Sequence, residues 1–145
     1  MHILVVGGAG YIGSHMVLRL AEDGHRVTTL DNLCSGHRDA VLHGDFVHGD
    51  IADTALLTDL FARSGFDAVM HFASFIQVGE SVAQPGKYYR NNVANTLNLL
   101  DVMRAFDVKR FIFSSTAATF GEPQYTPIDE AHPQLTLPPE NVVLG

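Results

Sequence analysis

The strongest constraint on the fold is an apolar run near the N-terminus that breaks directly into a cluster of glycines. Residues 3–6 read Ile-Leu-Val-Val, which is typical of a strand covered on both faces at the centre of a parallel sheet. Four glycines follow at once: Gly7, Gly8, Gly10 and Gly13. Their spacing fits both G-x-x-G-x-x-G and G-x-G-x-x-G, with a helical pattern starting near Tyr11. The sequence therefore predicts a tight strand-to-helix turn.

This glycine cluster has two interpretations. It can serve the turn alone, or it can let backbone approach a pyrophosphate that lies on the free N–H groups at the start of the helix. The next segment favours the second interpretation, because the alternating stretch from Arg26 to Leu30 ends in Asp31, 18 residues beyond Gly13. An acid about 20 residues on typically binds the adenosine ribose hydroxyls. Asp31 also predicts NAD rather than NADP, since a carboxylate repels a 2′-phosphate; Arg38 is the one nearby residue that would favour NADP.

The rest of the chain repeats the same alternation of strand and helix. Strands are predicted at Asp45 to His48, Asp67 to Phe72 and Lys109 to Phe113, with helices at Asp53 to Ala62 and Tyr88 to Phe106. Five such units predict an α/β fold, a Rossmann-type doubly wound parallel sheet in three αβα layers with strand order 3-2-1-4-5.

A change of composition divides the chain in two. Five of the six prolines lie between Pro123 and Pro139, where no periodicity remains. We therefore expect a dinucleotide-binding domain over residues 1–121 and a Pro-rich irregular tail over residues 122–145.

Several polar residues lie where the predicted strands and helices meet the crevice of the sheet. Asp50 and Ile51 follow the third strand, where they could flank an adenine, although Asp50 could equally be a helix cap or a loop acid. Four asparagines occupy the long helix, which suggests polar partners for some of them, and Asn91 is the preferred ligand contact. Glu80 is interpreted as a solvated surface acid.

Composition excludes several classes of function. A formal net charge of -7, with nine scattered Lys and Arg, disfavours nucleic acid as a partner. Cys34 is the single cysteine and the eight histidines show no metal-ligand spacing, so we expect no metal and a reducing compartment. No apolar run approaches 18 residues and no leader pattern is seen, so we expect a cytoplasmic protein without a membrane partner.

Taken together, the motifs resemble those of the UDP-glucose 4-epimerase family, within the extended short-chain dehydrogenases/reductases. The segments that carry the resemblance are Gly7-Gly-Ala-Gly-Tyr-Ile-Gly-Ser-His15, Leu30-Asp-Asn-Leu-Cys34, Gly49-Asp-Ile51, His71-Phe-Ala73, Val78-Gly-Glu-Ser-Val82, Tyr88-Tyr-Arg-Asn-Asn-Val93 and Phe111-Ile-Phe-Ser-Ser115. They span residues 1 to about 134, and the acidic and Val-Gly-Glu-Ser-Val segments are narrower signals than the glycines.

The resemblance implies a tightly held NAD and a UDP-glucose or UDP-galactose substrate, interconverted through a 4-keto intermediate. It implies cofactor contacts at Gly7, Gly10, Tyr11, Ile12, Gly13, Asp31, Asn32, Ser35, Asp50, Ile51, Phe72, Ala73, Asn91 and Ser114. It also implies that Thr116 is a catalytic residue, hydrogen-bonded to the reacting sugar oxygen. The family commonly has a lysine where this chain has Ile76.

One departure from the family bears on catalysis. The family's Tyr-x-x-x-Lys pair should fall near positions 141 and 145, where this chain reads Asn141 and Gly145. The base, its lysine and the sugar-binding domain are absent from the sequence, so we expect a truncated fold that is inactive alone and inclined to self-associate. The alternatives are a non-catalytic NAD-binding module or a fragment of a related sugar-nucleotide dehydratase or reductase.

Overall fold

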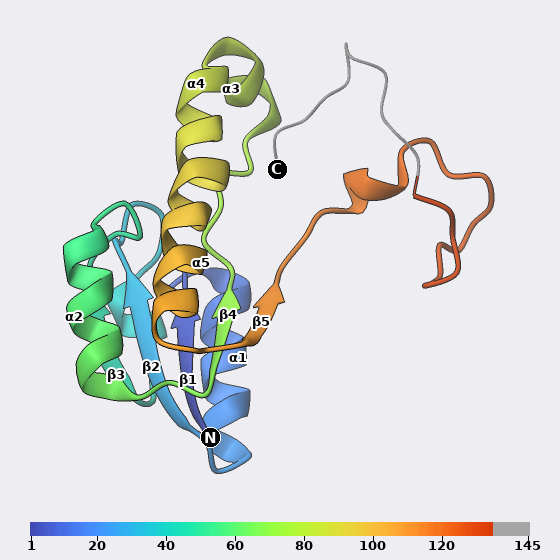
Figure 1. The fold of residues 1–145 in the computed structure, drawn as a ribbon. Coiled ribbons are helices and arrows are strands. Elements are labelled where there is room, and N and C mark those ends of the chain that lie inside the picture. Colours follow the sequence, from blue (N-terminus) through green and yellow to red (C-terminus); the bar gives the residue numbers. More distant parts are fainter. Residues whose placement is uncertain (135–145) are drawn as a thin grey trace.

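The computed structural model describes residues 1–134 of the chain. Its five strands form one parallel sheet in the order β3-β2-β1-β4-β5, which confirms the predicted topology. The central strand β1 (His2–Val6) pairs with β2 (Arg26–Asp31) on one side and with β4 (Ala68–His71) on the other. The outer strands are β3 (Asp45–His48) and β5 (Arg110–Phe113). Figure 1 shows the strands side by side, with their carboxyl ends at one edge.

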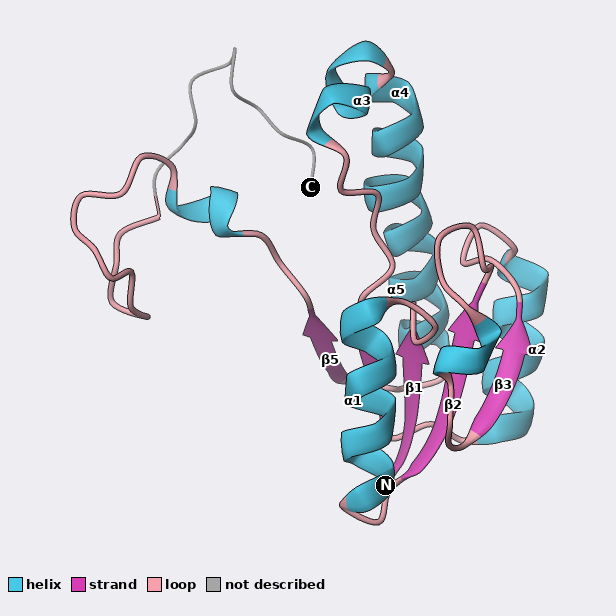
Figure 2. Ribbon diagram, turned by 180° about the vertical axis from the view of Figure 1, so that it is seen from behind, coloured by secondary structure: helices cyan, strands magenta, loops and turns pink. Residues whose placement is uncertain are grey.

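Helices cover both faces of the sheet, which explains why every residue of β1 is buried and why Ile3 to Val6 are all apolar. Helix α1 (Tyr11–Glu22) lies on one face, and α2 (Thr54–Ser64) and α5 (Asn95–Ala105) lie on the other (Figure 2). Two apolar cores result. Leu4 faces the α2 and α5 side, whereas Val5 faces the α1 side, and both are fully buried.

Helix α2 shows how local sequence sets the ends of an element. The Asp53 carboxylate accepts hydrogen bonds from the backbone N–H groups of Ala55 and Leu56, at 3.1 and 3.0 Å, so Asp53 is the N-cap and not the first helical residue. Gly65 ends the helix with a φ of 62°, in the left-handed region that glycine adopts without strain.

The long helix predicted from Tyr88 to Phe106 consists of three segments. A short helix α4 (Pro85–Tyr88) leads into a π-helical turn, Tyr89–Ala94, and then into α5. Helical spacing in the sequence predicts one apolar side at Val93, Leu97, Leu100 and Met103 or Arg104. Met103 is buried in the core as that spacing predicts, but it packs there with Leu99 and Val102, whereas Leu97 is 56% exposed.

The last described elements leave the sheet. After β5 a 3-10 turn, Ala117–Phe120, is followed by turns and bends through residues 121–134, which extend away from the strands (Figure 1). Tyr125 donates a hydrogen bond to Asp129 and packs on the buried ring of His132. The rest of the predicted Pro-rich tail and positions 141 and 145 lie outside the described residues.

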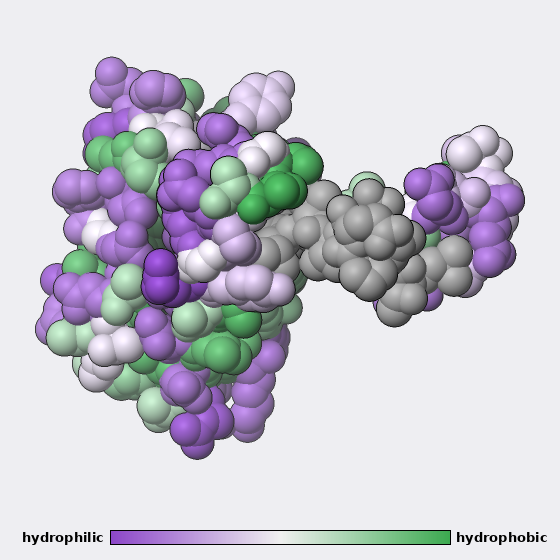
Figure 3. Space-filling view, turned by 90° about the horizontal axis from the view of Figure 1, so that it is seen from above, coloured by the Kyte–Doolittle hydropathy of each residue, from purple (hydrophilic) through white to green (hydrophobic). Residues whose placement is uncertain are grey.

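Apolar side chains reach the surface at the crevice end of the molecule. Helix α3 (Val78–Ala83) exposes Val78 and Val82, and Ile76 before it is 79% exposed. Figure 3, which views the molecule from above this end, shows apolar side chains coming to the surface between polar ones. None of the helices within residues 1–134 is long and apolar enough to cross a membrane.

Candidate nucleotide-binding site

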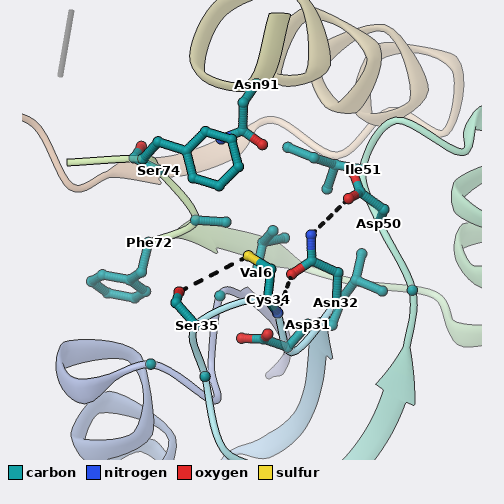
Figure 4. Close-up of a pocket in the computed structure, with 17 residues that line it drawn as sticks. Val6, Asp31, Asn32, Cys34, Ser35, Asp50, Ile51, Phe72, Ser74 and Asn91 are labelled. Carbon is teal, nitrogen blue, oxygen red and sulfur yellow. Dashed lines mark hydrogen bonds between the residues drawn. The ribbon is translucent and has the colours of Figure 1, made fainter. Parts of the chain in front are cut away.

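A cavity of about 580 Å³, including its open mouth, lies at the carboxyl ends of β1, β2, β3 and β4. Ten of the fourteen predicted cofactor residues line it: Gly7, Gly10, Asp31, Asn32, Ser35, Asp50, Ile51, Phe72, Ala73 and Asn91. They come from five separate parts of the chain, and Figure 4 shows several of their side chains around one space. The fold therefore gathers most of the predicted set at a single place.

The glycines differ in what a side chain would meet. Gly7 has a φ of 78°, and a Cβ there would lie 2.6 Å from the backbone nitrogen of Ala73. A Cβ on Gly13 would collide with the carbonyl oxygen of Gly7. A Cβ on Gly10 would have a single neighbour, the Gly7 oxygen at 3.4 Å, which is an ordinary contact. Gly7 and Gly13 are thus required by the protein itself, whereas Gly10 leaves space that a ligand can use.

Helix α1 presents an uncapped N-terminus to the same region. Gly10 is its N-cap, and no side chain in the described part of the chain caps the first turn. Its first N–H groups are therefore left for an anion, which the helix dipole also favours. The predicted contacts Tyr11, Ile12 and Gly13 belong to this turn but do not line the cavity, and the side chains of Tyr11 and Ile12 are exposed.

Asp31 is fixed in place at the end of β2. One carboxylate oxygen accepts from the backbone N–H of Ala9 at 2.9 Å and the other from that of Leu33 at 2.8 Å. The residue is 8% exposed and still lines the cavity. Because each carboxylate oxygen has a second lone pair, Asp31 can still accept from ligand hydroxyls.

Asn32 and Asp50 join the ends of β2 and β3. The Asn32 amide donates to one Asp50 oxygen at 2.7 Å, and the backbone N–H of Ala52 donates to the other at 2.8 Å (Figure 4). Asp50 therefore lines the cavity and also stabilises the following loop, which combines the two interpretations that the sequence left open. The N-cap of α2 is Asp53 instead.

Arg38, the residue that could have favoured a 2′-phosphate, is engaged elsewhere. Its guanidinium donates to the carbonyl oxygen of Val41 at 3.1 Å and lies 4.5 Å from the centre of the Phe46 ring. Arg38 begins the 3-10 turn, Arg38–Ala40, and does not line the cavity.

Two predicted residues after β5 lie outside the cavity lining. Ser114 donates its backbone N–H to the carbonyl oxygen of His71 at 3.0 Å, which continues the pairing of β5 with β4. The Thr116 hydroxyl accepts from the backbone N–H of Ala118 at 3.2 Å and caps the 3-10 turn. The catalytic assignment of Thr116 stays a prediction.

The interpretation of Glu80 as a solvated acid is wrong. Its carboxylate accepts from the Lys87 ammonium at 2.6 Å and from the Tyr88 hydroxyl at 2.8 Å, and these hydrogen bonds lower the pKa of Glu80. The contacts tie α3 to α4 beside the cavity. Side chains that touch within one helix are three or four residues apart, whereas these partners are seven and eight apart, so helical periodicity did not reveal the contacts.

The cavity also includes residues that the sequence did not single out as contacts, among them Gly36 and Phe75. Gly36 packs so closely on Ala9 that a Cβ would lie 2.8 Å from its backbone carbon. Phe75 belongs to the irregular segment between β4 and α3, and irregular segments carry no periodic signal. Within residues 1–134, no three His, Cys, Asp or Glu side chains are grouped to hold a metal ion.

Comparison with known proteins agrees with this geometry. The model of the NAD dependent epimerase/dehydratase family matches residues 3–142. The chain belongs to this family. It is 53% identical over 139 residues to a UDP-glucose 4-epimerase of Halalkalibacterium halodurans, covering 96% of this chain and 42% of the relative. It is 46% identical over 148 residues to a probable UDP-arabinose 4-epimerase of Oryza sativa, covering 95% of this chain and 35% of the relative.

Solved structures give the same result. The crystal structure of UDP-glucose 4-epimerase from Brucella ovis in complex with NAD matches with a TM-score of 0.88 and 48% identity, over 94% of this chain and 42% of that one. The crystal structure of UDP-glucose 4-epimerase from Bifidobacterium longum in complex with NAD+ and UDP matches with a TM-score of 0.86 and 39% identity. The match covers 92% of this chain and 42% of that one. These matches confirm the resemblance to UDP-glucose 4-epimerases, while the chain spans about two fifths of the length of such relatives.

Proposed function

We propose that this chain is the NAD-binding part of a UDP-sugar 4-epimerase. The observation that carries the proposal is one cavity lined both by Gly10, the N-cap of a helix without a side-chain cap, where a Cβ would have open space, and by the fixed carboxylate of Asp31. A helix N-terminus binds a pyrophosphate, a glycine lets the backbone approach that pyrophosphate closely, and a carboxylate accepts hydrogen bonds from the ribose hydroxyls. Relatives of the same fold are solved with NAD bound.

The residues present fit the dinucleotide in a definite order. The first-turn N–H groups of α1 would hold the pyrophosphate, Asp31 would accept from the adenosine ribose, and Asp50 and Ile51 would flank the adenine. Ala73 and Asn91 also line the cavity. NAD, when bound, supplies a hydride acceptor; the chain contributes its binding and orientation.

Titration of the purified chain with NAD and with NADP tests this proposal. We expect NAD to bind at least about tenfold more tightly, because Asp31 repels a 2′-phosphate and Arg38 is held by Val41 and Phe46. Arg38→Ala should leave the preference unchanged. Equal or tighter binding of NADP would contradict the proposal.

The sugar substrate of the whole protein is a further part of the proposal. Relatives named for UDP-glucose and for UDP-arabinose are similar to this chain at 53% and 46% identity. We propose a UDP-linked sugar epimerised at C4 through transient oxidation, and NAD-binding residues alone do not select among such sugars. UDP binding by the whole protein, with no binding of the free sugar, is the expected result.

We propose that the chain as printed does not interconvert UDP-glucose and UDP-galactose. Asn141 and Gly145 supply no tyrosine or lysine at the positions implied by the resemblance, and loss of a general base alone typically costs about 10²–10⁴-fold in rate. A coupled assay with saturating NAD should detect no turnover. Turnover that Thr116→Ala abolishes, in protein of the mass expected for 145 residues, would show that another base is present.

Two other functions predict different experimental results. A non-catalytic NAD-binding module would bind NAD but would remain inactive when a longer chain or a partner is supplied. A sugar-nucleotide dehydratase or reductase would convert its substrate irreversibly instead of equilibrating two C4 epimers. The intact mass of the protein from its native cells separates the epimerase proposal from the first alternative, because a product of the relatives' length would carry the remaining domain.

A further inference from the structure

The side chain of Asn92 holds one wall of the cavity, because it hydrogen-bonds to both backbone polar groups of Phe75. Phe75 lines the cavity in the irregular segment between β4 and α3. Its backbone N–H donates to the Asn92 side-chain oxygen at 2.9 Å, and its carbonyl oxygen accepts from the Asn92 side-chain nitrogen at 3.0 Å. This pairing does for Phe75 what a neighbouring strand does for a residue of the sheet.

The same Asn92 oxygen also sets the orientation of its neighbour. The side-chain nitrogen of Asn91 donates to it at 2.8 Å. This bond occupies one N–H of the Asn91 amide and fixes its orientation, and leaves the amide oxygen, which only accepts hydrogen bonds, and the second N–H for the cavity that Asn91 lines. Figure 4 shows the Asn91 side chain directed from its helix toward the cavity.

A buried chain of hydrogen bonds fixes Asn92 itself. The backbone carbonyl oxygen of Asn92 accepts from the Thr96 hydroxyl at 2.9 Å, and the hydroxyl oxygen of Thr96 lies 3.0 Å from Nε2 of His71. Nδ1 of His71 accepts from the backbone N–H of Ala73 at 3.1 Å, so Nε2 carries the proton and donates to Thr96. His71 is 1% exposed, and this burial lowers its pKa to about 4, which keeps the ring neutral. The hydrogen bonds therefore connect Ala73, in one wall, to the helix that carries Asn91.

We propose that Asn92 is a positioning residue for the dinucleotide: it holds the Phe75 wall and presents the Asn91 oxygen to a ligand donor. The Asn91 oxygen can accept from a ribose hydroxyl or a carboxamide N–H. The inference rests on the proposed binding of NAD in this cavity. Asn91 and Asn92 both lie in the π-helical turn, and such turns are frequent at functional sites.

A double-mutant cycle read by NAD titration tests the inference. The set comprises the unsubstituted chain, Asn92→Leu, Asn91→Ala and the double variant, with Asn95→Leu as the matched control on the same helix. Asn92→Leu should weaken NAD binding about tenfold, the equivalent of one or two lost hydrogen bonds. Asn91→Ala should weaken binding in the normal background and have little further effect in Asn92→Leu, because the two residues act together. Hydrogen exchange of the Phe75 amide should accelerate in Asn92→Leu and stay unchanged in Asn95→Leu.

The outcomes separate this inference from the function on which it rests. Full NAD affinity in Asn92→Leu, or an equal effect of Asn91→Ala in both backgrounds, overturns the inference alone. Failure of the unsubstituted chain to bind NAD overturns the proposed function and this inference with it. If Asn92→Leu does not fold, Asn92→Asp keeps the shape but loses the donor to Phe75; it should bind NAD several-fold more weakly than Asn95→Asp, and equal affinity contradicts the inference.

Discussion

Strands β1 and β5 have similar apolar sequences and opposite environments. All five residues of β1 are buried, because the strand has a partner on each side and helices on both faces. In β5, which pairs only with β4 within the described chain, Ile112 is 56% and Phe113 42% exposed. The two strands also differ in their relation to the site. Predicted cofactor residues that follow β1 and β2 line one cavity, whereas Thr116, which follows β5, lies outside the cavity lining. An apolar run thus identifies a strand without showing what covers it.

The largest expected difference between the two strands comes from a matched pair of alanine substitutions. Leu4→Ala in β1 should lower the free energy of unfolding by about 2–5 kcal/mol, because the side chain is fully buried and leaves a cavity. Ile112→Ala in β5 should change it by less than about 0.5 kcal/mol. Urea unfolding monitored by circular dichroism gives both values, and similar losses at the two positions would mean that β5 is covered.

The next effect depends on pH and arises beside β1, in β4. The pKa of His71 is about 4 in the folded chain against an unfolded value near 6.5, so the unfolded state binds the proton first as pH falls. Stability that is fully present above about pH 6.5 should therefore be lost progressively down to about pH 4, by at most about 3 kcal/mol.

Urea unfolding between pH 7 and pH 4 measures this loss. His71→Gln should flatten the slope in that window, and His37→Gln, at an exposed position, should not. An unchanged slope in His71→Gln would show that other groups cause it.

The smallest effect concerns association through the exposed edge. Ile112 and Phe113 offer apolar surface on a strand with one sheet partner among residues 1–134, which favours self-association. Sedimentation should show a concentration-dependent shift to larger species, reduced in Ile112→Lys and kept in Leu42→Lys, an exposed apolar position far from β5 in the sequence. A stable monomer over a wide concentration range would count against this expectation.

The sequence predicted the fold well because its signals are local and repeated. Glycines directly after Val6, the acid that ends β2 and the alternation of elements together leave few possible topologies. The long helix was less predictable, since apolar residues occur on more than one side of it: Leu99 and Met103 are buried while Leu97 is exposed. The spacing also gave no sign of the π-helical turn that precedes α5.

The sequence predicted those cavity residues that directly follow a strand. Asp31, Asp50 and Ala73 come at strand ends, and parallel strands bring their carboxyl ends to one edge. Asn92 and Glu80 act through partners in neighbouring segments, so their functions are set by packing and not by spacing. Composition did suggest that some asparagines have polar partners, without showing which.

The most direct test of NAD binding compares two glycine substitutions, Gly10→Val and Gly13→Val. At Gly13 a side chain collides with backbone, so both the stability and the NAD affinity of the chain should fall. At Gly10 the backbone has ordinary φ and ψ of -77° and 175°, and a Cβ meets only one ordinary contact before the cavity. Calorimetric titration of Gly10→Val should therefore show NAD binding lost, while the free energy of unfolding falls only by the roughly 1 kcal/mol expected for a poorer N-cap residue. Undiminished NAD affinity in folded Gly10→Val would contradict the assignment of this cavity to the dinucleotide.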